Sequence, residues 1–131
     1  MKYFNEWVGT LETIIKTMEV GNVTGRKLDT DTAFDQLFEK ALKARQKNAA
    51  IFLISNGASA SMASHVAADL GKNGNLRTMV LSDPSLLTAV GNDIDFVEVF
   101  AEPLRRFGAK QDLLVAISSS GRSPNILSAI K

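Results

Sequence analysis

The sequence contains no cysteine, which excludes disulfide bridges, cysteine-ligated zinc and thiol catalysis. It also lacks an excess of charge of either sign, because 15 Lys and Arg residues are balanced by 14 Asp and Glu residues, for a formal net charge of +1. A protein whose main task is to bind nucleic acid or an anionic membrane usually carries a basic excess. We therefore expect neither nucleic acid nor a membrane as a partner.

Long apolar runs are missing as well. None approaches the roughly 18 residues that cross a bilayer, and residues 1–6 lack the uninterrupted apolar core of a signal peptide. What remains is a chain of 131 residues that is 45% hydrophobic, an ordinary composition for one globular domain. Together with the lack of cysteine, which fits a reducing compartment, these features predict a soluble protein of the cytoplasm.

Two amphipathic helices are predicted in residues 1–48. In the first, apolar side chains recur at spacings of three and four and form one stripe. The second begins near Asp29 and Asp31 after a glycine-containing break at residues 21–25. Its basic end, at residues 40–47, is interpreted as a solvated helix terminus rather than a nucleic-acid patch. The stripe of the first helix consists of Phe4, Trp7, Val8, Leu11, Ile14, Ile15 and Met18.

Three short apolar runs further along are predicted to be β-strands. Because these runs are apolar on both faces, they favour a parallel sheet that helices cover on both sides. Their alternation with helical patterns predicts the α/β class, with a doubly wound parallel sheet that follows the two N-terminal helices. The three runs are residues 49–54, 78–81 and 113–117.

Helical patterns separate and flank these strands. The first covers residues 59–70. After the second strand we expect a short helical turn that begins at residues 83–84, and then a longer helix around residues 96–107. Pro103 is expected to kink or divide that longer helix, because proline lacks an N–H group and clashes with the preceding turn. Gly108 is expected to end it.

Small polar loops follow the first and third strands, and ligands of open parallel sheets bind beyond the carboxyl ends of the strands. The loop at residues 118–125 contains four serines and a glycine. Its hydroxyls and the free N–H groups at the start of the next helix favour the binding of an anion. Ser123 and Pro124 are predicted to be the N-cap and the first residue of that helix. The alternative, that the serines only fill the turn and cap the helix, stays open. Because no Walker or Gly-x-Gly-x-x-Gly motif occurs, we expect a phosphate on a small molecule and no nucleotide cofactor.

His65 is the only histidine, and it precedes Asp69 by four residues within the predicted helix at residues 59–70. Residues at these spacings share one helix face, so the imidazole and the carboxylate can converge. Such a pair can bind a divalent ion or share a proton-transfer task. A histidine with a merely structural or surface role is the alternative, and the spacing leaves both open.

Taken together, these motifs resemble the sugar isomerase (SIS) domain and, within it, the phosphoheptose isomerase branch. The resemblance covers residues 49–131, and the two leading helices also suit that branch. It implies a single SIS domain over residues 1–131, in which residues 1–48 are the N-terminal helices and residues 49–131 are the first three β/α units of a flavodoxin-like, three-layer α/β/α sheet. The motifs that carry the resemblance are residues 56–59, His65, residues 90–93 and residues 117–125.

In function, the resemblance implies an aldose–ketose isomerase of a phosphorylated sugar. The expected reaction converts sedoheptulose 7-phosphate to a heptose 7-phosphate, a precursor of bacterial surface polysaccharides. The family also implies a homo-oligomer, namely a tetramer with sites near subunit interfaces. The alternative is a non-enzymatic SIS module that binds phosphosugars or a replication initiator, and the retention of His65 with a carboxylate at position 69 favours the enzyme.

The family's functional positions can be carried over one by one. In the family, the serine loop holds the phosphate, whereas Asn and Asp positions hold sugar oxygens. His65 and Asp69 match two positions that serve in catalysis and, in some members, bind zinc. The implied substrate-binding residues are Asn56, Gly57, Ala58, Ser59, Asn92, Asp93, Ser118, Ser119, Ser120 and Ser123.

Three residues depart from the family's pattern. Asp69 replaces a glutamate, and the loss of one methylene moves the carboxylate by roughly 1 Å, which lowers the rate unless the site compensates. Ala58 replaces a glycine, a mild change unless the backbone there needs a positive φ. Arg122 replaces a frequent asparagine and adds a positive charge that suits a phosphate.

A fourth departure concerns the C-terminal part. The family's second catalytic histidine and a nearby glutamine lie on a later helix, so two further strand–helix units, roughly 60 residues, are expected beyond Lys131. With three strands, the expected order is second, first, third, and residues 113–117 form an open edge. We expect the 131-residue chain alone to show little or no turnover.

Overall fold

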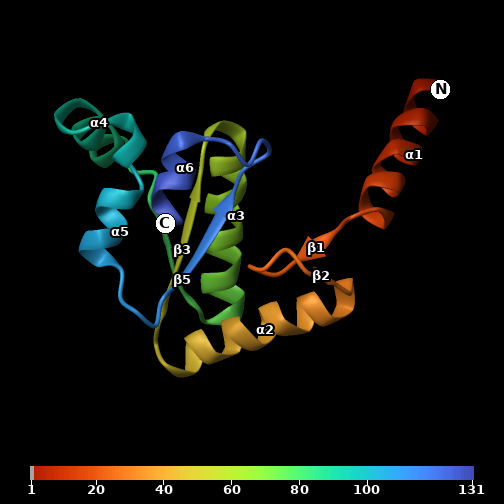
Figure 1. Ribbon diagram of the computed structural model, residues 1–131, viewed down its shortest axis with the longest axis horizontal. Coiled ribbons are helices and arrows are strands. Elements are labelled where there is room, and N and C mark those ends of the chain that lie inside the picture. Colours follow the sequence, from red (N-terminus) through yellow and green to blue (C-terminus); the bar gives the residue numbers. More distant parts are fainter. Residues whose placement is uncertain (1) are drawn as a thin grey trace. The chain divides into compact units, whose positions relative to one another are not determined.

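The computed structural model describes residues 2–131 (Figure 1). Packing divides the chain into two compact units, one that ends at Lys40 and one that comprises Ala41–Lys131. The prediction of a single domain over residues 1–131 stays a prediction. Within the described residues, no helix has both the length and the apolar character needed to cross a membrane.

Both predicted N-terminal helices are present. α1 spans Lys2–Lys16 and buries none of its residues. α2 spans Thr30–Gln46, and just before its start Asp29 accepts hydrogen bonds from the backbone N–H and the hydroxyl of Thr32, at 3.0 and 3.1 Å. These bonds hold the pKa of Asp29 below its usual range. The carboxylate is therefore charged where the helix dipole favours a negative group.

A short β-hairpin lies between α1 and α2, where the sequence predicted only a break. β1 (Val20–Gly21) pairs with β2 (Lys27–Leu28) in antiparallel fashion. The side chain of Asn22 shapes the turn, because its Oδ1 accepts hydrogen bonds from the backbone N–H groups of Thr24 and Arg26, both at 3.0 Å. Strands this short carry no alternating apolar pattern, so one side chain rather than periodicity specifies the hairpin.

The three predicted strands form a parallel sheet in the order β4-β3-β5, which confirms the predicted order. β3 spans Ala50–Ser55, β4 spans Arg77–Val80 and β5 spans Leu113–Ile117. All residues of β3 are buried, as expected of a central strand that is covered on both faces. β5 lies at an edge of the sheet formed by residues 2–131.

Helices cover both faces of the sheet, so the predicted three-layer α/β/α fold is confirmed (Figure 1). Successive side chains of a strand point to opposite faces. Ile51 and Leu53 pack with buried alanines of α3 on one face. Phe52 and Ile54 pack on the other face with residues from α4, α6 and the segment between α4 and α5. The helices are α3 (Gly57–Gly74), α4 (Pro84–Asp93), α5 (Ala101–Phe107) and α6 (Pro124–Ala129).

Two of the helical predictions were wrong in detail. α4 continues for 10 residues where the sequence predicted a short turn. The segment that follows is divided between a 3-10 helix, η1 (Phe96–Glu98), and α5, so the division precedes Pro103 instead of falling at it. Pro103 lies in the first turn of α5, where a missing N–H breaks no helical hydrogen bond. Gly108 ends α5 as predicted, since a Cβ there would lie 2.6 Å from the carbonyl oxygen of Leu104.

Asp112 joins the amino-terminal ends of β3 and β5. Its Oδ1 accepts a hydrogen bond of 2.7 Å from the backbone N–H of Ala50, the first residue of β3. Its Oδ2 accepts one of 2.8 Å from the N–H of Ala109, in the turn before β5. One carboxylate thus connects the start of the central strand to the turn that leads into its neighbour.

Candidate functional site

The carboxyl ends of β3 and β5 lie side by side, because Ser55 is paired with Ile117 in the register of the two strands. The hydroxyl of Ser55, a residue only 5% exposed, donates a hydrogen bond of 2.6 Å to the carbonyl oxygen of Ile117. The two predicted polar loops begin immediately after these residues. The structure therefore brings the loop after β3 and the loop after β5 together at the carboxyl ends of the strands, as predicted.

The first loop leads directly into α3. Asn56 is the N-cap residue, with extended backbone and no capping bond from its side chain, and Gly57 has a φ of +55°. That left-handed conformation favours glycine. Ala58 has no positive φ, so an alanine at this position introduces no backbone strain. Ser59 follows in the first turn of α3 and is half-buried.

Asn125 holds the side chain of Asn56, a role that the sequence did not reveal. Nδ2 of Asn56 donates to Oδ1 of Asn125 at 3.0 Å, and Nδ2 of Asn125 donates to Oδ1 of Asn56 at 2.9 Å. Asn125 is 3% exposed, and its Oδ1 also accepts the N–H of Ile126 at 3.0 Å. In the sequence, Asn125 is only one more polar residue after the serine loop, and no signal pairs it with Asn56, which lies 69 positions away.

The serine loop, residues 118–124, is partly held by its own hydroxyls. Oγ of Ser118 accepts the N–H of Gly121 at 3.1 Å, and Oγ of Ser120 accepts the N–H of Arg122 at 3.2 Å. Gly121 has a φ of +61°, which suits the turn to glycine. The side chain of Arg122 is exposed.

Ser123 and Pro124 are the N-cap and the first residue of α6, which confirms the prediction. The hydroxyl of Ser123, however, makes no capping hydrogen bond. No hydrogen bond within the described chain engages the hydroxyl of Ser119 either. The hydroxyls of Ser119 and Ser123 therefore have no hydrogen-bond partner within residues 2–131, and the interpretation that these serines only cap the helix and fill the turn stays open.

His65 and Asp69 lie on one face of α3, as their spacing predicted. Nε2 of His65 is 3.4 Å from Oδ2 of Asp69, and the two side chains are 79% and 50% exposed. The pair is thus open to a ligand that approaches from solvent. Within residues 2–131, no group of three or more His, Cys, Asp or Glu side chains is placed to hold a metal ion. The described residues therefore supply two ligands where a protein zinc site takes three or four.

Asn92 and Asp93 lie at the C-terminal end of α4. Nδ2 of Asn92 donates a hydrogen bond of 2.8 Å to Oδ1 of Asp93, and both residues are exposed. No hydrogen bond among the described residues connects this pair to either loop. The structure thus brings the first loop and the serine loop together, and His65 and Asp69 together, but among the described residues no hydrogen bond joins Asn92 or Asp93 to either group.

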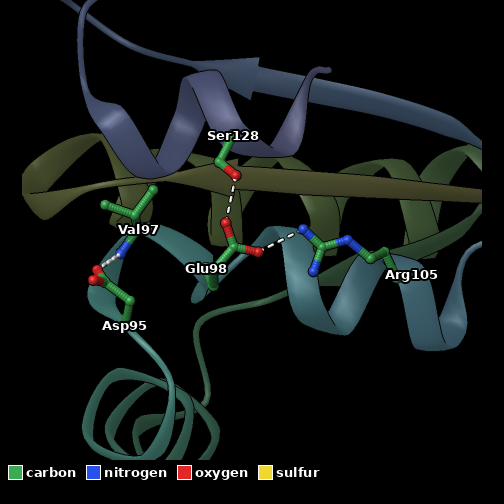
Figure 2. Close-up of polar contacts among 5 residues, drawn as sticks. All are labelled: Asp95, Val97, Glu98, Arg105 and Ser128. Carbon is green, nitrogen blue, oxygen red and sulfur yellow. Dashed lines mark hydrogen bonds and ion pairs between the residues drawn. The ribbon is translucent and has the colours of Figure 1, made fainter.

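A polar cluster holds α6 near its other end (Figure 2). Glu98 of η1 accepts a hydrogen bond of 2.8 Å from the hydroxyl of Ser128 and one of 2.5 Å from Nη2 of Arg105. The bond from Ser128 first, and then the bond from Arg105, hold the pKa of Glu98 below its usual range. α6 is therefore bonded at its start through Asn125 and near its end through Ser128.

The amino-acid sequence of this chain is similar to a known domain family and to known isomerases. The model of the SIS domain family matches residues 3–131. The phosphoheptose isomerase of Azoarcus sp. (strain BH72) is 38% identical over 102 residues, which make up 73% of this chain and 52% of that protein. The phosphoheptose isomerase of Bradyrhizobium sp. (strain ORS 278) is 42% identical over 87 residues, or 62% of this chain and 44% of that protein.

Solved structures agree with these relatives. Phosphoheptose isomerase GmhA from Neisseria gonorrhoeae matches with a TM-score of 0.78 and 32% identity over 98% of this chain and 64% of that chain. A phosphoheptose isomerase from Francisella tularensis matches with a TM-score of 0.78 and 25% identity over 98% and 63%. The chain spans about half the length of the curated relatives it matches. Because the family model matches almost all of its residues, this chain belongs to the SIS domain family.

Proposed function

We propose that this chain carries the phosphosugar-binding part of an aldose–ketose isomerase whose substrate is sedoheptulose 7-phosphate. The observation that carries the proposal is the pairing of Asn56 with Asn125, the residue directly after the serine loop, where the carboxyl ends of β3 and β5 lie side by side. In open parallel sheets this edge is where ligands bind. The similarity to phosphoheptose isomerases supplies the substrate, and the product is a heptose 7-phosphate of the kind used in bacterial surface polysaccharides.

The serine loop binds the phosphate in this proposal. The hydroxyls of Ser119 and Ser123 have no partner within residues 2–131 and are ready to donate. The hydroxyls of Ser118 and Ser120 accept backbone N–H groups and keep their own hydrogens for a phosphate oxygen. Such remote contacts lower the barrier by placing the reacting carbons correctly.

The reaction moves a proton between two carbons of the sugar. A base removes a proton from C1 of the ketose, the enediol forms, and the proton returns to C2 while a hydroxyl proton passes from O1 to O2. Asp69 is proposed as one acid–base group, with the family's second catalytic histidine as the other, and His65 beside Asp69 orients its carboxylate. The exposed position of the pair leaves room for a substrate. Asn92 and Asp93 are proposed to hold sugar oxygens, as the family resemblance implies.

Replacement of Asp69 tests this chemistry. Asp69→Asn keeps the shape of the side chain and removes the basic oxygen, so in the intact protein kcat for sedoheptulose 7-phosphate should fall by about 10²–10⁴-fold. The dissociation constant of the sugar phosphate should stay within about twofold, because the phosphate contacts remain. Asp69→Glu should remain active, and Asp35→Asn, which changes an exposed aspartate of α2, is the matched control.

Two results would redirect the proposal. Equal turnover by the intact protein and its Asp69→Asn variant would remove Asp69 from the mechanism. Binding of sedoheptulose 7-phosphate without conversion by the intact protein would instead support a non-enzymatic, phosphosugar-binding SIS module; the 131-residue chain alone is not the test, because it is expected to show little or no turnover.

Assembly, location and metal content belong to the same proposal. A homo-oligomer, a tetramer by family resemblance, is supported by α1, whose apolar stripe includes Trp7 at 59% exposure and contains no buried residue. A cytoplasmic location is supported by the absence of cysteine. A zinc ion held by His65 and Asp69 would need further ligands, so no step of the reaction is assigned to it.

A further inference from the structure

Two consecutive residues at the end of β3 reach both ends of the serine loop. At the start of the loop, the Ser55 hydroxyl donates to the carbonyl oxygen of Ile117, the last residue of β5. At its end, Asn56 forms the reciprocal amide pair with Asn125, in the first turn of α6. Residues 118–124 therefore lie between two anchor points, one bonded to the last residue of β3 and one to the N-cap residue of α3 that follows it.

The amide pair also determines how Asn56 is turned. Oδ1 of Asn125 accepts the backbone N–H of Ile126, which establishes which end of the Asn125 amide is oxygen. Its Nδ2 must then face Oδ1 of Asn56, and Nδ2 of Asn56 must face Oδ1 of Asn125. One N–H of the exposed Asn56 amide is left for a ligand, in a defined direction. Without Asn125, the same amide can rotate by half a turn and offer an acceptor instead.

We infer that Asn125 is a positioning residue. It fixes the orientation of the Asn56 side chain beside the end of the serine loop, so that the loop at Asn56 and the serine loop bind one phosphorylated ligand at a fixed spacing. The inference rests on the proposed function and concerns a residue that touches no ligand itself. Burial supports it, because Asn125 is 3% exposed and, among the described residues, its side chain forms hydrogen bonds only with Asn56 and the N–H of Ile126. A buried amide is costly unless it is paired, so the pairing is well defined.

A double-mutant cycle separates positioning from a general loss of structure. The dissociation constants of sedoheptulose 7-phosphate and of inorganic phosphate are measured by calorimetry for the parent protein, Asn56→Ala, Asn125→Ala and the double variant. If Asn125 acts through Asn56, Asn125→Ala weakens sugar phosphate binding by about tenfold in the parent protein, the equivalent of the lost hydrogen bonds. In the Asn56→Ala background it changes binding by less than about twofold.

Inorganic phosphate and a second site provide the controls. Inorganic phosphate probes the serine loop alone, so its affinity should change by less than about threefold in Asn125→Ala. Ser128→Ala removes a bond at the other end of α6 that does not involve Asn56, and it should leave the affinity for the sugar phosphate unchanged. If Asn125→Ala does not fold, Asn125→Ser, which is smaller but still polar, takes its place in the cycle.

The outcomes are distinct. Equal losses from Asn125→Ala in both backgrounds, or a parallel loss for inorganic phosphate, would overturn the inference, because they indicate a general collapse of the loop. If the parent protein binds inorganic phosphate but not sedoheptulose 7-phosphate, the proposed function fails and this inference fails with it. Binding of the sugar phosphate by the parent, together with a non-additive cycle, supports both.

Discussion

Removal of the Asp112 carboxylate should destabilise the sheet at its amino-terminal end. The N–H of Ala50 is bonded to Oδ1 at 2.7 Å, and Ala50 is 1% exposed, so this N–H depends on the carboxylate as its acceptor in the folded protein. A buried N–H left without a partner costs about 1–3 kcal/mol. The second bond, to the exposed turn at Ala109, adds little, because water can take its place. We expect Asp112→Ala to lower the free energy of unfolding by about 2 kcal/mol.

The measurement is the free energy of unfolding in urea together with the midpoint of thermal unfolding. At this chain length, about 2 kcal/mol corresponds to a decrease of about 8 °C. Asp112→Asn keeps one acceptor oxygen and should lose about half as much. Gln111→Ala, at the exposed neighbouring position, is the control. If Asp112→Ala unfolds at the same urea concentration as Gln111→Ala, the carboxylate does not stabilise the start of β3 and the reasoning fails.

The remaining predictions concern pH and assembly. Hydrogen bonds from Ser128 and Arg105 lower the pKa of Glu98 below its ordinary 4.5. The charged carboxylate therefore stabilises the fold at a pH above 4.5, and this contribution is lost as the pH falls through the lower pKa of the folded state. Acid titration of stability should therefore be shallower for Glu98→Gln; an unchanged slope would contradict this. Trp7→Glu should shift sedimentation toward smaller species, and an unchanged profile would remove α1 from the interface.

The sheet could be predicted from sequence because its information is local. The apolar run that became β3 is hydrophobic on both faces, which is typical of a central strand in a parallel sheet that helices cover on both sides. The i, i+4 spacing of His65 and Asp69 likewise determines that both side chains share a helix face. In both cases the pattern of residues within one short segment predicts the geometry, and no contact with a distant segment is needed to recognise it.

The features that could not be predicted depend on contacts between distant segments. The pairing of Asn56 with Asn125 joins residues that are 69 positions apart, and no pattern in a single sequence marks the two as partners. The hairpin at Asn22 depends on one side chain in a turn between very short strands. The length of α4 was missed because its residues include threonine, glycine and asparagine, which weaken a helical pattern without preventing a helix that packs on the sheet.

The composition of the serine loop suggested two roles, the formation of a turn before α6 and the binding of an anion, and the structure leaves atoms for both. Ser118 and Ser120 shape the turn as acceptors, and an accepting hydroxyl keeps its hydrogen for a further bond. Ser119 and Ser123 take no part in that turn. Turn formation and the proposed anion binding therefore use different atoms of the same loop. In the proposed function the turn is already formed before a phosphate arrives, so little of the binding energy would be lost to ordering the loop and more of it would hold the sugar in place.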